Sequence, residues 1–272
     1  MSESFPVVSK WEQRVVRLLD AVCLAPLTTK FARRDLILTY HSVESQPSGY
    51  RYAVDAQLYV RQIEYLERHF DIVSLDQIYD EQPRKRPRVA ITFDDAYADF
   101  YENVYSLMRA KGLPATVFVP TQFISSDVGL LKRDENLDKS HLTWEQIREI
   151  AASSAITFGS HTHSHRSAVA EIDNFEADLQ KSLELLESQA DIRPDYLAYP
   201  YGQCNAQTDA IALACGFKGL LTMEDAPLRT GPIQGRLDVY QRNQELPYFK
   251  LTTAGLLGPG TRERMRNLLA RN

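Results

Sequence analysis

A chain of 272 residues, with 44% hydrophobic and 25% charged side chains, is long enough to bury a sizeable core in one large α/β domain. Its formal net charge of −5 is too small to favour binding to nucleic acid or electrostatic attachment to anionic lipid, so neither is expected. Three cysteines, Cys23, Cys204 and Cys215, argue against a disulfide framework, and no stretch approaches the roughly 20 apolar residues of a transmembrane segment.

The N-terminal part, residues 1–34, is expected to form a helical extension packed on the main domain. Residues 9–24 have helical periodicity, with Trp11 and Leu18 on one apolar stripe. Peripheral contact of this helix with a membrane or a partner is the alternative. Because Asp20 interrupts the apolar run and no small-residue cleavage site follows it, a secretory signal is not expected. The interpretation is a cytoplasmic protein, with membrane association through this helix as the alternative.

Short apolar strands then alternate with helical stretches. Strands are predicted at 35–40, 71–75, 89–93, 115–120, 156–160, 196–202 with its turn, 217–223 and 236–240, and helices at 57–70, 97–111, 144–152, 172–189 and 206–215, with two short helices closing the chain. The connection 121–140 is long and polar, as functional loops and lids often are. Such alternation is typical of a parallel sheet with crossover helices, and about seven units without a linker predict one barrel-like domain, residues 35–272.

The third predicted strand ends in two adjacent carboxylates, Asp94 and Asp95. Two ionised carboxylates this close repel each other unless positive charge lies beside them, and a divalent cation usually supplies that charge. Taken alone, the pair also fits a helix N-cap followed by a first-turn acid, since residues 96–110 look helical. A second motif is needed to decide between these two interpretations.

That motif is the strand at 156–160, which runs into His161, His163 and His165, three of the six histidines in the chain. On a helical turn, His161 and His165 would lie on one face, four residues apart, which is a spacing for metal ligands. One carboxylate and two imidazoles, with other positions left open, form the ligand set of a catalytic zinc or a related metal. The two motifs together predict a metal site.

Candidate functional residues also follow other strands at the same predicted edge. In a parallel barrel, the chemistry lies at the carboxyl ends of the strands. The residues expected there come from four strands: His41, Asp94, Asp95, His161, His165 and Tyr201. Their convergence favours an enzyme or binding site built at that edge.

The motifs TFDDAY, GSHTHSH and YPYG, in this order, resemble the first three motifs of the polysaccharide deacetylases, the carbohydrate esterases with NodB homology. LTYHSV, GLPATVFVPT and LTWEQIREI are also similar to that family, and the similarity covers about residues 35–255. The resemblance implies a distorted (β/α) barrel of about seven parallel strands.

The resemblance also implies a function. Members of this family remove acetyl groups from sugar polymers with a divalent metal. The expected activity is therefore hydrolysis of acetyl groups on an N-acetyl-hexosamine-containing glycan or glycan precursor, by attack of a metal-bound water. Zinc is the expected metal, with cobalt, nickel and manganese as alternatives, and an acetylated sugar polymer or oligosaccharide is the expected partner.

Matched residue by residue, the resemblance assigns roles to the two metal-site motifs. It implies that Asp95, His161 and His165 are the metal ligands. Asp94 would be the general base that takes a proton from the attacking water, in agreement with the chemistry of metal-assisted hydrolysis. His163 projects elsewhere in the family pattern and is expected to have a supporting or structural role.

The third motif is expected to face the substrate. The resemblance implies that the backbone N–H of Tyr201 helps to hold the developing oxyanion. Tyr97, Pro200 and Tyr201 are the residues expected to bind the substrate. These assignments come from the family pattern and not from spacing alone.

Two departures from the family pattern concern the base. Ala96 stands where the family usually has Gly, a change that is compatible with a negative φ. Ala198 stands where many members have an Arg that pairs with the base. Arg236 is the candidate to supply this charge from the next strand, with a surface salt bridge as the alternative.

A third departure concerns the acid. Many members have a late histidine that protonates the leaving amine, but no histidine follows His165 here. His41 is the remaining candidate at a strand end, with a core or supporting role as the alternative. The runner-up function is therefore a weakly active or inactive barrel that binds carbohydrate or a partner, and a hydrolase of small amides or esters is a third hypothesis.

Overall fold

A computed structural model of the chain describes residues 35–80, 85–131, 139–152, 155–224, 228, 230–240 and 244–253. The helix expected at 9–24, Cys23 and the last of the expected helices lie outside these ranges, so the boundary at residue 34 stays a prediction. Among the described helices, none is long and apolar enough to cross a membrane.

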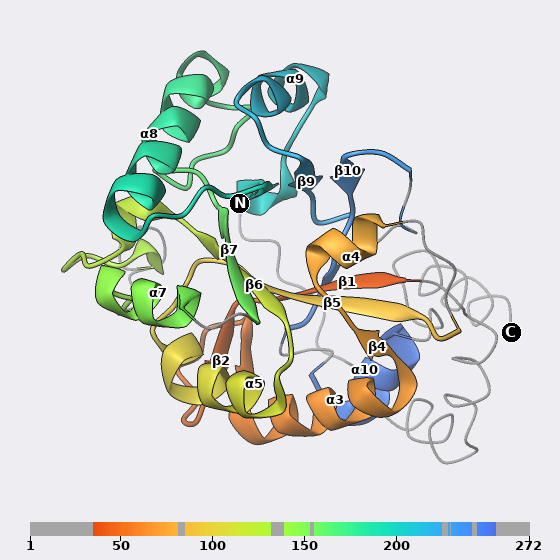
Figure 1. Ribbon diagram of the computed structural model, residues 1–272. Coiled ribbons are helices and arrows are strands. Elements are labelled where there is room, and N and C mark those ends of the chain that lie inside the picture. Colours follow the sequence, from red (N-terminus) through yellow and green to blue (C-terminus); the bar gives the residue numbers. More distant parts are fainter. Residues whose placement is uncertain are drawn as a thin grey trace, which may run out of the picture.

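The main sheet has nine strands in the described residues, and every pairing in it is parallel. The strands are β1 (Leu36–Tyr40), β4 (Asp71–Ile72), β5 (Arg88–Phe93), β6 (Ala115–Val119), β7 (Ile156–Ser160), β8 (Tyr196–Ala198), β9 (Gly219–Leu221), β10 (Ile233–Gln234) and β11 (Leu237–Asp238). Their order is β10-β9-β8-β7-β6-β5-β1-β11, with β4 paired to β5. The sheet is curved (Figure 1), and no pairing between its two end strands, β10 and β11, is present in the described residues. The expected parallel α/β architecture is confirmed, and β10 is an addition to the predicted strands.

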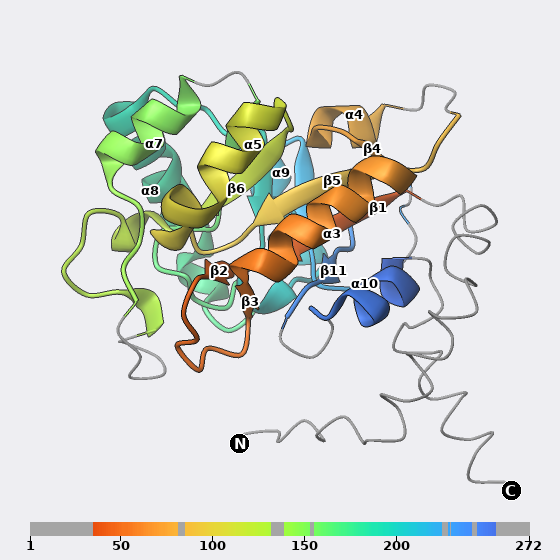
Figure 2. The ribbon, with the colours of Figure 1, turned by 90° about the horizontal axis from the view of Figure 1, so that it is seen from below.

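Helices connect the strands and lie largely around the outside of the curved sheet (Figure 1). They are α3 (Ala56–His69), α4 (Leu75–Tyr79), α5 (Ser106–Lys111), α7 (Trp144–Ala151), α8 (Ile172–Ala190), α9 (Ala206–Ala214) and α10 (Leu246–Thr253), of which α10 packs beside α3 (Figure 2). Capping boxes begin α7 at Thr143 and α9 at Asn205. These caps satisfy backbone N–H groups that would otherwise lack partners at each helix start.

The helix expected from residue 97 begins later. A π-helical segment, Phe100–Tyr105, leads into α5, and residues 94–98 lie in turns before it. Asp94 and Asp95 are therefore not the cap and first turn of this helix, and that alternative interpretation is wrong. Two three-residue strands, β2 (Ser42–Glu44) and β3 (Ala53–Asp55), pair with each other and escaped prediction because neither contains a run of apolar residues.

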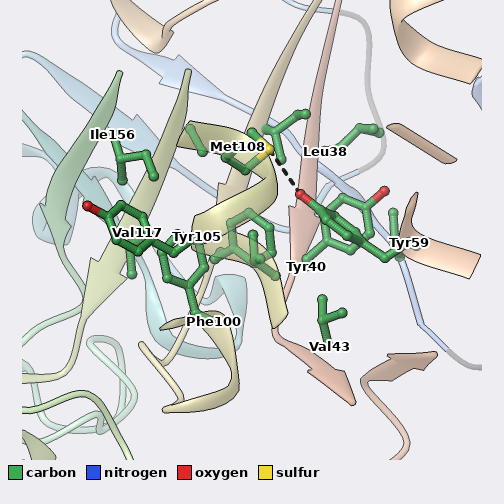
Figure 3. Packing of buried hydrophobic residues seen from close by; sticks show 14 of the residues in the cluster. Leu38, Tyr40, Val43, Tyr59, Phe100, Tyr105, Met108, Val117 and Ile156 are labelled. Carbon is green, nitrogen blue, oxygen red and sulfur yellow. Dashed lines mark hydrogen bonds between the residues drawn. The ribbon is translucent and has the colours of Figure 1, made fainter. Parts of the chain in front are cut away.

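Alternate side chains of the central strands build two separate cores. Leu38, Tyr40 and Val117 pack outward against Tyr59 and Met108 of the surrounding helices, and the Tyr59 hydroxyl donates to Met108 Sδ at 3.2 Å (Figure 3). Side chains that point to the other face of the sheet, from β1, β5, β6, β8 and β9, form the inner core together with α4. They are Ile37, Ala90, Phe118, Ala198 and Leu221. Both faces of the sheet are thus covered, as is usual for parallel sheets.

The same alternation positions the site. His41 has the inner-side register of Ile37, and Asp94 has that of Ala90. The ladder continues beyond the strands, because the N–H of Asp94 donates to the Tyr40 carbonyl at 2.9 Å and the N–H of His161 donates to the Val119 carbonyl at 3.0 Å. Polar side chains at the carboxyl ends therefore gather on the inner side of the sheet.

Candidate metal centre

Asp94 and Asp95 directly follow β5, and both are buried. Asp94 continues the alternation of the strand, whereas the backbone of Asp95 has a φ of +69°. This left-handed residue turns the chain, so the second carboxylate is not sent to the opposite face of the sheet. Both carboxylates face one imidazole, since His161 Nε2 lies 3.5 Å from Asp95 Oδ1 and 4.0 Å from Asp94 Oδ2.

The next residue, Ala96, has a φ of +50°, so the negative φ expected from the sequence is wrong. A residue with a Cβ in this region costs about 1–3 kcal/mol and persists only where the surroundings hold it. Asp95 is in the same region, so two consecutive residues with side chains share this conformation. The backbone at this point needs support from elsewhere in the fold.

The histidines come from residues 161–165, which form an irregular turn in which Thr162 and His165 have φ values of +66° and +53°. The helical turn assumed for their spacing is therefore wrong. The carboxylate of Asp178 on α8 holds the turn by accepting two of its backbone N–H groups, at 2.9 and 3.1 Å. The rings of His161 and His165 nevertheless meet, with centroids 4.8 Å apart.

Three ligand atoms converge in this pocket. Asp95 Oδ1 lies 3.2 Å from His165 Nε2 and 3.5 Å from His161 Nε2, and one ligand atom from each of the three residues lies within 4.8 Å of the other two. His161 Nδ1 lies 2.7 Å from the Ala198 carbonyl oxygen, which can only accept a hydrogen bond, so Nδ1 carries a proton and Nε2 is the atom that can ligate. Asp95 Oδ1 is buried and makes no hydrogen bond of ordinary geometry. This donor set fits a divalent cation.

Electrostatics in the pocket agree with this fit. Burial raises the pKa of the Asp95 carboxyl, but the neighbouring imidazoles of His161 and His165, which favour the ionised carboxylate, outweigh it and hold the pKa well below its usual value. Burial lowers the pKa of His161, but the Asp94 and Asp95 carboxylates outweigh it and raise that pKa. The pocket is thus strongly selective for positive charge, which a proton on an imidazole or a cation can supply.

Arg236, immediately before β11, lies against the expected base. Its Nη1 and Nη2 donate to Asp94 Oδ1 and Oδ2 at 2.7 and 2.8 Å, and its Nε donates to the Thr222 carbonyl at 3.2 Å. The side chain is only 1% exposed, so the alternative of a surface salt bridge is wrong. The guanidinium therefore lies where it can supply the positive charge beside Asp94 that an arginine at position 198 would supply.

The Arg236 contact predicts a pH effect. Burial raises the pKa of the Asp94 carboxyl, but the Arg236 charge, followed by that of His161, lowers it below the usual value. Arg236→Ala removes the first of these charges, so the pKa of Asp94 should rise and the acidic limb of kcat/KM against pH should move to higher pH. The measurement is a pH–rate profile of the wild type and the variant.

The matched control is Arg88→Ala. Arg88 forms a second buried pair, with Asp35, at the opposite end of β5. Losing that pair should lower stability without moving the acidic limb. A limb that stays in place in Arg236→Ala would show that Arg236 does not set the ionisation of Asp94.

His41 follows β1, which pairs with β5 as expected. Its Nδ1 lies 3.6 Å from Asp238 Oδ1, and its ring stacks on Tyr52 with centroids 4.7 Å apart. Burial raises the pKa of the Asp238 carboxyl to about 6, although the His41 charge opposes this. His41 is half-buried, and its charge also acts on Asp94, so it lies near the base and not in the apolar core.

The three residues expected to bind substrate have different surroundings. Tyr201 is 56% exposed, and its ring lies edge-on to His165 with centroids 5.0 Å apart. Pro200 is buried, and Tyr97 is fully buried against Tyr50. A buried ring cannot meet a polymer without rearrangement, so the substrate contacts expected for Tyr97 and Pro200 are not supported.

Sequence reasoning missed His141 and Asp238. His141 is buried, and its Nδ1 lies 2.7 Å from the backbone oxygen of Asp95. Burial lowers its pKa, which favours the neutral ring. His141 bonds to a backbone carbonyl, so no pattern of side-chain types in the sequence indicates its role. Asp238 stands two residues after Arg236 and therefore lies on the same face of an extended chain. That period-two relation could have identified Asp238.

Comparison of the sequence with known families matches residues 81–220 to the family described as polysaccharide deacetylase. A poly-beta-1,6-N-acetyl-D-glucosamine N-deacetylase of Escherichia coli K12 is 24% identical over 224 residues, which cover 69% of this chain and 33% of that protein. The Staphylococcus aureus MSSA476 protein of the same name is 25% identical over 187 residues, 64% of this chain and 62% of that protein. The chain thus spans less than two thirds of the length of either relative.

Solved structures show the same fold. IcaB from Ammonifex degensii superposes with a TM-score of 0.69 at 24% identity, covering 80% of this chain and 95% of that chain. The Streptococcus pyogenes deacetylase PplD, solved in complex with acetate, superposes with a TM-score of 0.67 at 20% identity, covering 81% and 97%. These likenesses confirm the distorted (β/α) barrel of the NodB-homology type.

Proposed function

The chain belongs to the polysaccharide deacetylase family, and from this premise we propose that it is a metal-dependent hydrolase of acetyl groups on an N-acetyl-hexosamine-containing glycan. The observation that carries the proposal is the buried convergence of Asp95, His161 and His165 beside the Asp94–Arg236 pair. The names of the E. coli and S. aureus relatives make poly-β-1,6-N-acetylglucosamine the first substrate to test.

Asp95, His161 and His165 would hold the cation, for which zinc is the first candidate by donor preference and cobalt, nickel and manganese are alternatives. When bound, the cation would act as a Lewis acid that makes water more acidic and polarises the acetyl carbonyl. The protein fixes the donors for this purpose. The Ala198 carbonyl orients the His161 ring, and Asp178 holds the turn that carries both imidazoles.

Asp94 is the proposed general base. The Arg236 guanidinium pairs with its carboxylate and so stabilises the ionised form. The same carboxylate faces the His161 imidazole, as that of Asp95 does. It can therefore receive a proton from a water placed between it and the substrate carbonyl. The backbone N–H of Tyr201, whose ring lies edge-on to His165, is the proposed donor to the oxygen that gains negative charge.

His41 is the proposed acid. An amide nitrogen must gain a proton as its C–N bond breaks, and His41 lies on the inner side of the sheet next to Asp94. The carboxyl of Asp238 lies 3.6 Å from Nδ1, where it can pair with the ring once the ring is protonated. In this proposal, His41 would supply the proton in place of a histidine after His165.

The His41 assignment predicts a difference between two substrates. His41→Ala should reduce cleavage of an N-acetyl amide by about 10²–10⁴-fold, the usual contribution of a general acid. An activated aryl acetate should lose far less, because its phenolate leaves without a proton. Both substrates share the base and the proposed ion, so the ratio of the two rates isolates the acid. Equal losses on both would make His41 a positioning residue.

The proposal is tested by measuring acetate release from a panel of acetylated compounds. We expect release from β-1,6-linked N-acetylglucosamine oligomers, with less from chitin oligomers, O-acetylated xylo-oligomers and acetanilide. Binding of the oligomers without any release would favour the carbohydrate-binding barrel. Release from acetanilide alone would favour a hydrolase of small amides.

A further inference from the structure

A short segment, Ser140–Leu142, hydrogen-bonds to the backbone next to Asp95, the first of the proposed metal ligands. The Leu142 N–H donates to the Ala96 carbonyl at 2.8 Å, and the Ala98 N–H donates to the Ser140 carbonyl at 3.0 Å. Tyr97 and His141 form an antiparallel bridge between these two bonds. We call Ser140–Leu142 the clamp segment.

The His141 ring adds a third bond. Its Nδ1 lies 2.7 Å from the Asp95 backbone oxygen, and its Nε2 lies 3.0 Å from the Leu130 backbone nitrogen. A carbonyl only accepts and a backbone N–H only donates, so Nδ1 carries the proton and Nε2 carries the lone pair. The ring therefore links the Asp95 carbonyl to the backbone N–H of Leu130.

The position of the ring is fixed from several sides. It packs against the rings of Tyr97 and Phe123, with centroids 4.9 and 5.5 Å away. Gly129 packs against the residue before the clamp segment, and a Cβ added there would lie 2.1 Å from the Lys139 carbonyl oxygen. Lys139 is itself held by ion pairs with two buried carboxylates, at 2.8 and 2.5 Å. The ring can thus transmit rigidity to Asp95.

Asp95 and Ala96 need such support because both have positive φ and neither is glycine. If this turn relaxed, the Cα–Cβ bond of Asp95 would point elsewhere and its carboxylate would leave the two imidazoles. We infer that His141 is a positioning residue that holds the Asp95 backbone so that its carboxylate meets His161 and His165. The inference rests on the proposed function in one respect, that Asp95 is a ligand.

The test uses three substitutions of His141 in the full chain. Asn places an amide nitrogen near the position of Nδ1 and keeps the bond to Asp95. Gln places an amide oxygen near the position of Nε2 and keeps the bond to Leu130 instead. Phe keeps only ring packing. His69→Asn, at the end of α3, is the control for loss of a histidine outside the site.

The readout is the dissociation constant of Zn²⁺, measured by competition with a chromophoric chelator. We expect His141→Gln and His141→Phe to bind about 10–100-fold more weakly than the wild type, the usual loss when a partner of a metal ligand is removed. His141→Asn and His69→Asn should stay close to the wild type. A merely structural role would give equal losses for Asn and Gln, alongside equal falls in Tm, and would overturn the inference.

A second readout does not depend on metal. Imidazole ¹⁵N shifts of the metal-free wild type should show His141 neutral with the proton on Nδ1, and a proton on Nε2 would overturn the inference. The two failures are distinguishable. A wild type that binds no Zn²⁺ overturns the proposed function and this inference with it, whereas a wild type that binds it no more tightly than His141→Phe overturns the inference alone.

Discussion

Asp94→Asn is expected to lower the turnover of acetate release by about 10²–10⁴-fold while the chain keeps its divalent ion. The amide cannot accept a proton, so the base is lost. The ion is kept because Asp94 is not among the three residues whose ligand atoms converge, namely Asp95, His161 and His165. Turnover and metal content per chain are measured on the same preparation.

Stability must be followed in this experiment. Asp94 is the partner of the buried Arg236, and removing one partner of a buried ion pair costs up to about 3–5 kcal/mol. Asn keeps one acceptor oxygen for the guanidinium, so part of this cost is avoided. Rates are therefore compared below the unfolding transitions of both proteins. Asp95→Asn is the matched variant, and equal loss of metal from both would contradict the division between base and ligand.

His161→Ala is expected to abolish tight metal binding. The metal affinity should fall by more than the about 10–100-fold that is lost when a residue bonded to a ligand is removed. Acetate release should fall with the bound metal, because His161 Nε2 is one of three donors in the pocket. Metal content by elemental analysis and the Zn²⁺ dissociation constant check this result. Full binding in His161→Ala would show that the ligands are assigned wrongly.

The control for His161→Ala is His163→Ala. His163 lies between the two proposed ligands, but its ring bonds to Thr121 Oγ1 at 2.9 Å and the Asp178 bond uses its backbone. The His163→Ala variant should therefore keep most of the wild-type affinity for the metal. If both variants lost the ion equally, the effect would come from disturbance of the turn and not from loss of a ligand.

Metal binding should also depend on pH. The two carboxylates outweigh burial and raise the pKa of His161, so the metal-free protein holds a proton there to a higher pH than a free imidazole does. A protonated imidazole cannot ligate, so the ion must displace that proton. The apparent Zn²⁺ affinity should therefore increase as pH rises through this pKa and should fall below it.

Most of the sheet could be predicted from local pattern. The run at 89–93 is mostly apolar and rich in β-branched residues, and strands of that kind are buried on both faces of a parallel sheet. The strands that were missed, β2, β3 and β10, have only two or three residues. The strands β4, β8, β9 and β11 are equally short, but each lies within a longer run that has a strand pattern. The register of the missed strands depends on neighbours that are distant in the sequence, so a window of a few residues holds no signal for them.

The site could be predicted only in part, for a related reason. Asp94, Asp95 and the histidines follow strands, and the alternation of a strand determines the face on which its next residue lies. The helical spacing of His161 and His165 was wrong because the turn uses left-handed residues that a spacing rule cannot show. His141 acts through a backbone carbonyl, which has no side-chain type to match.

Metal-dependent deacetylation is tested by titrating Zn²⁺ into the metal-free chain while acetate release from a β-1,6-linked N-acetylglucosamine oligomer is followed. We expect no release without the ion and a linear rise that reaches a plateau at one ion per chain. Release that is unaffected by a chelator, or a chain that binds the ion and the oligomer yet releases no acetate, would contradict metal-dependent deacetylation.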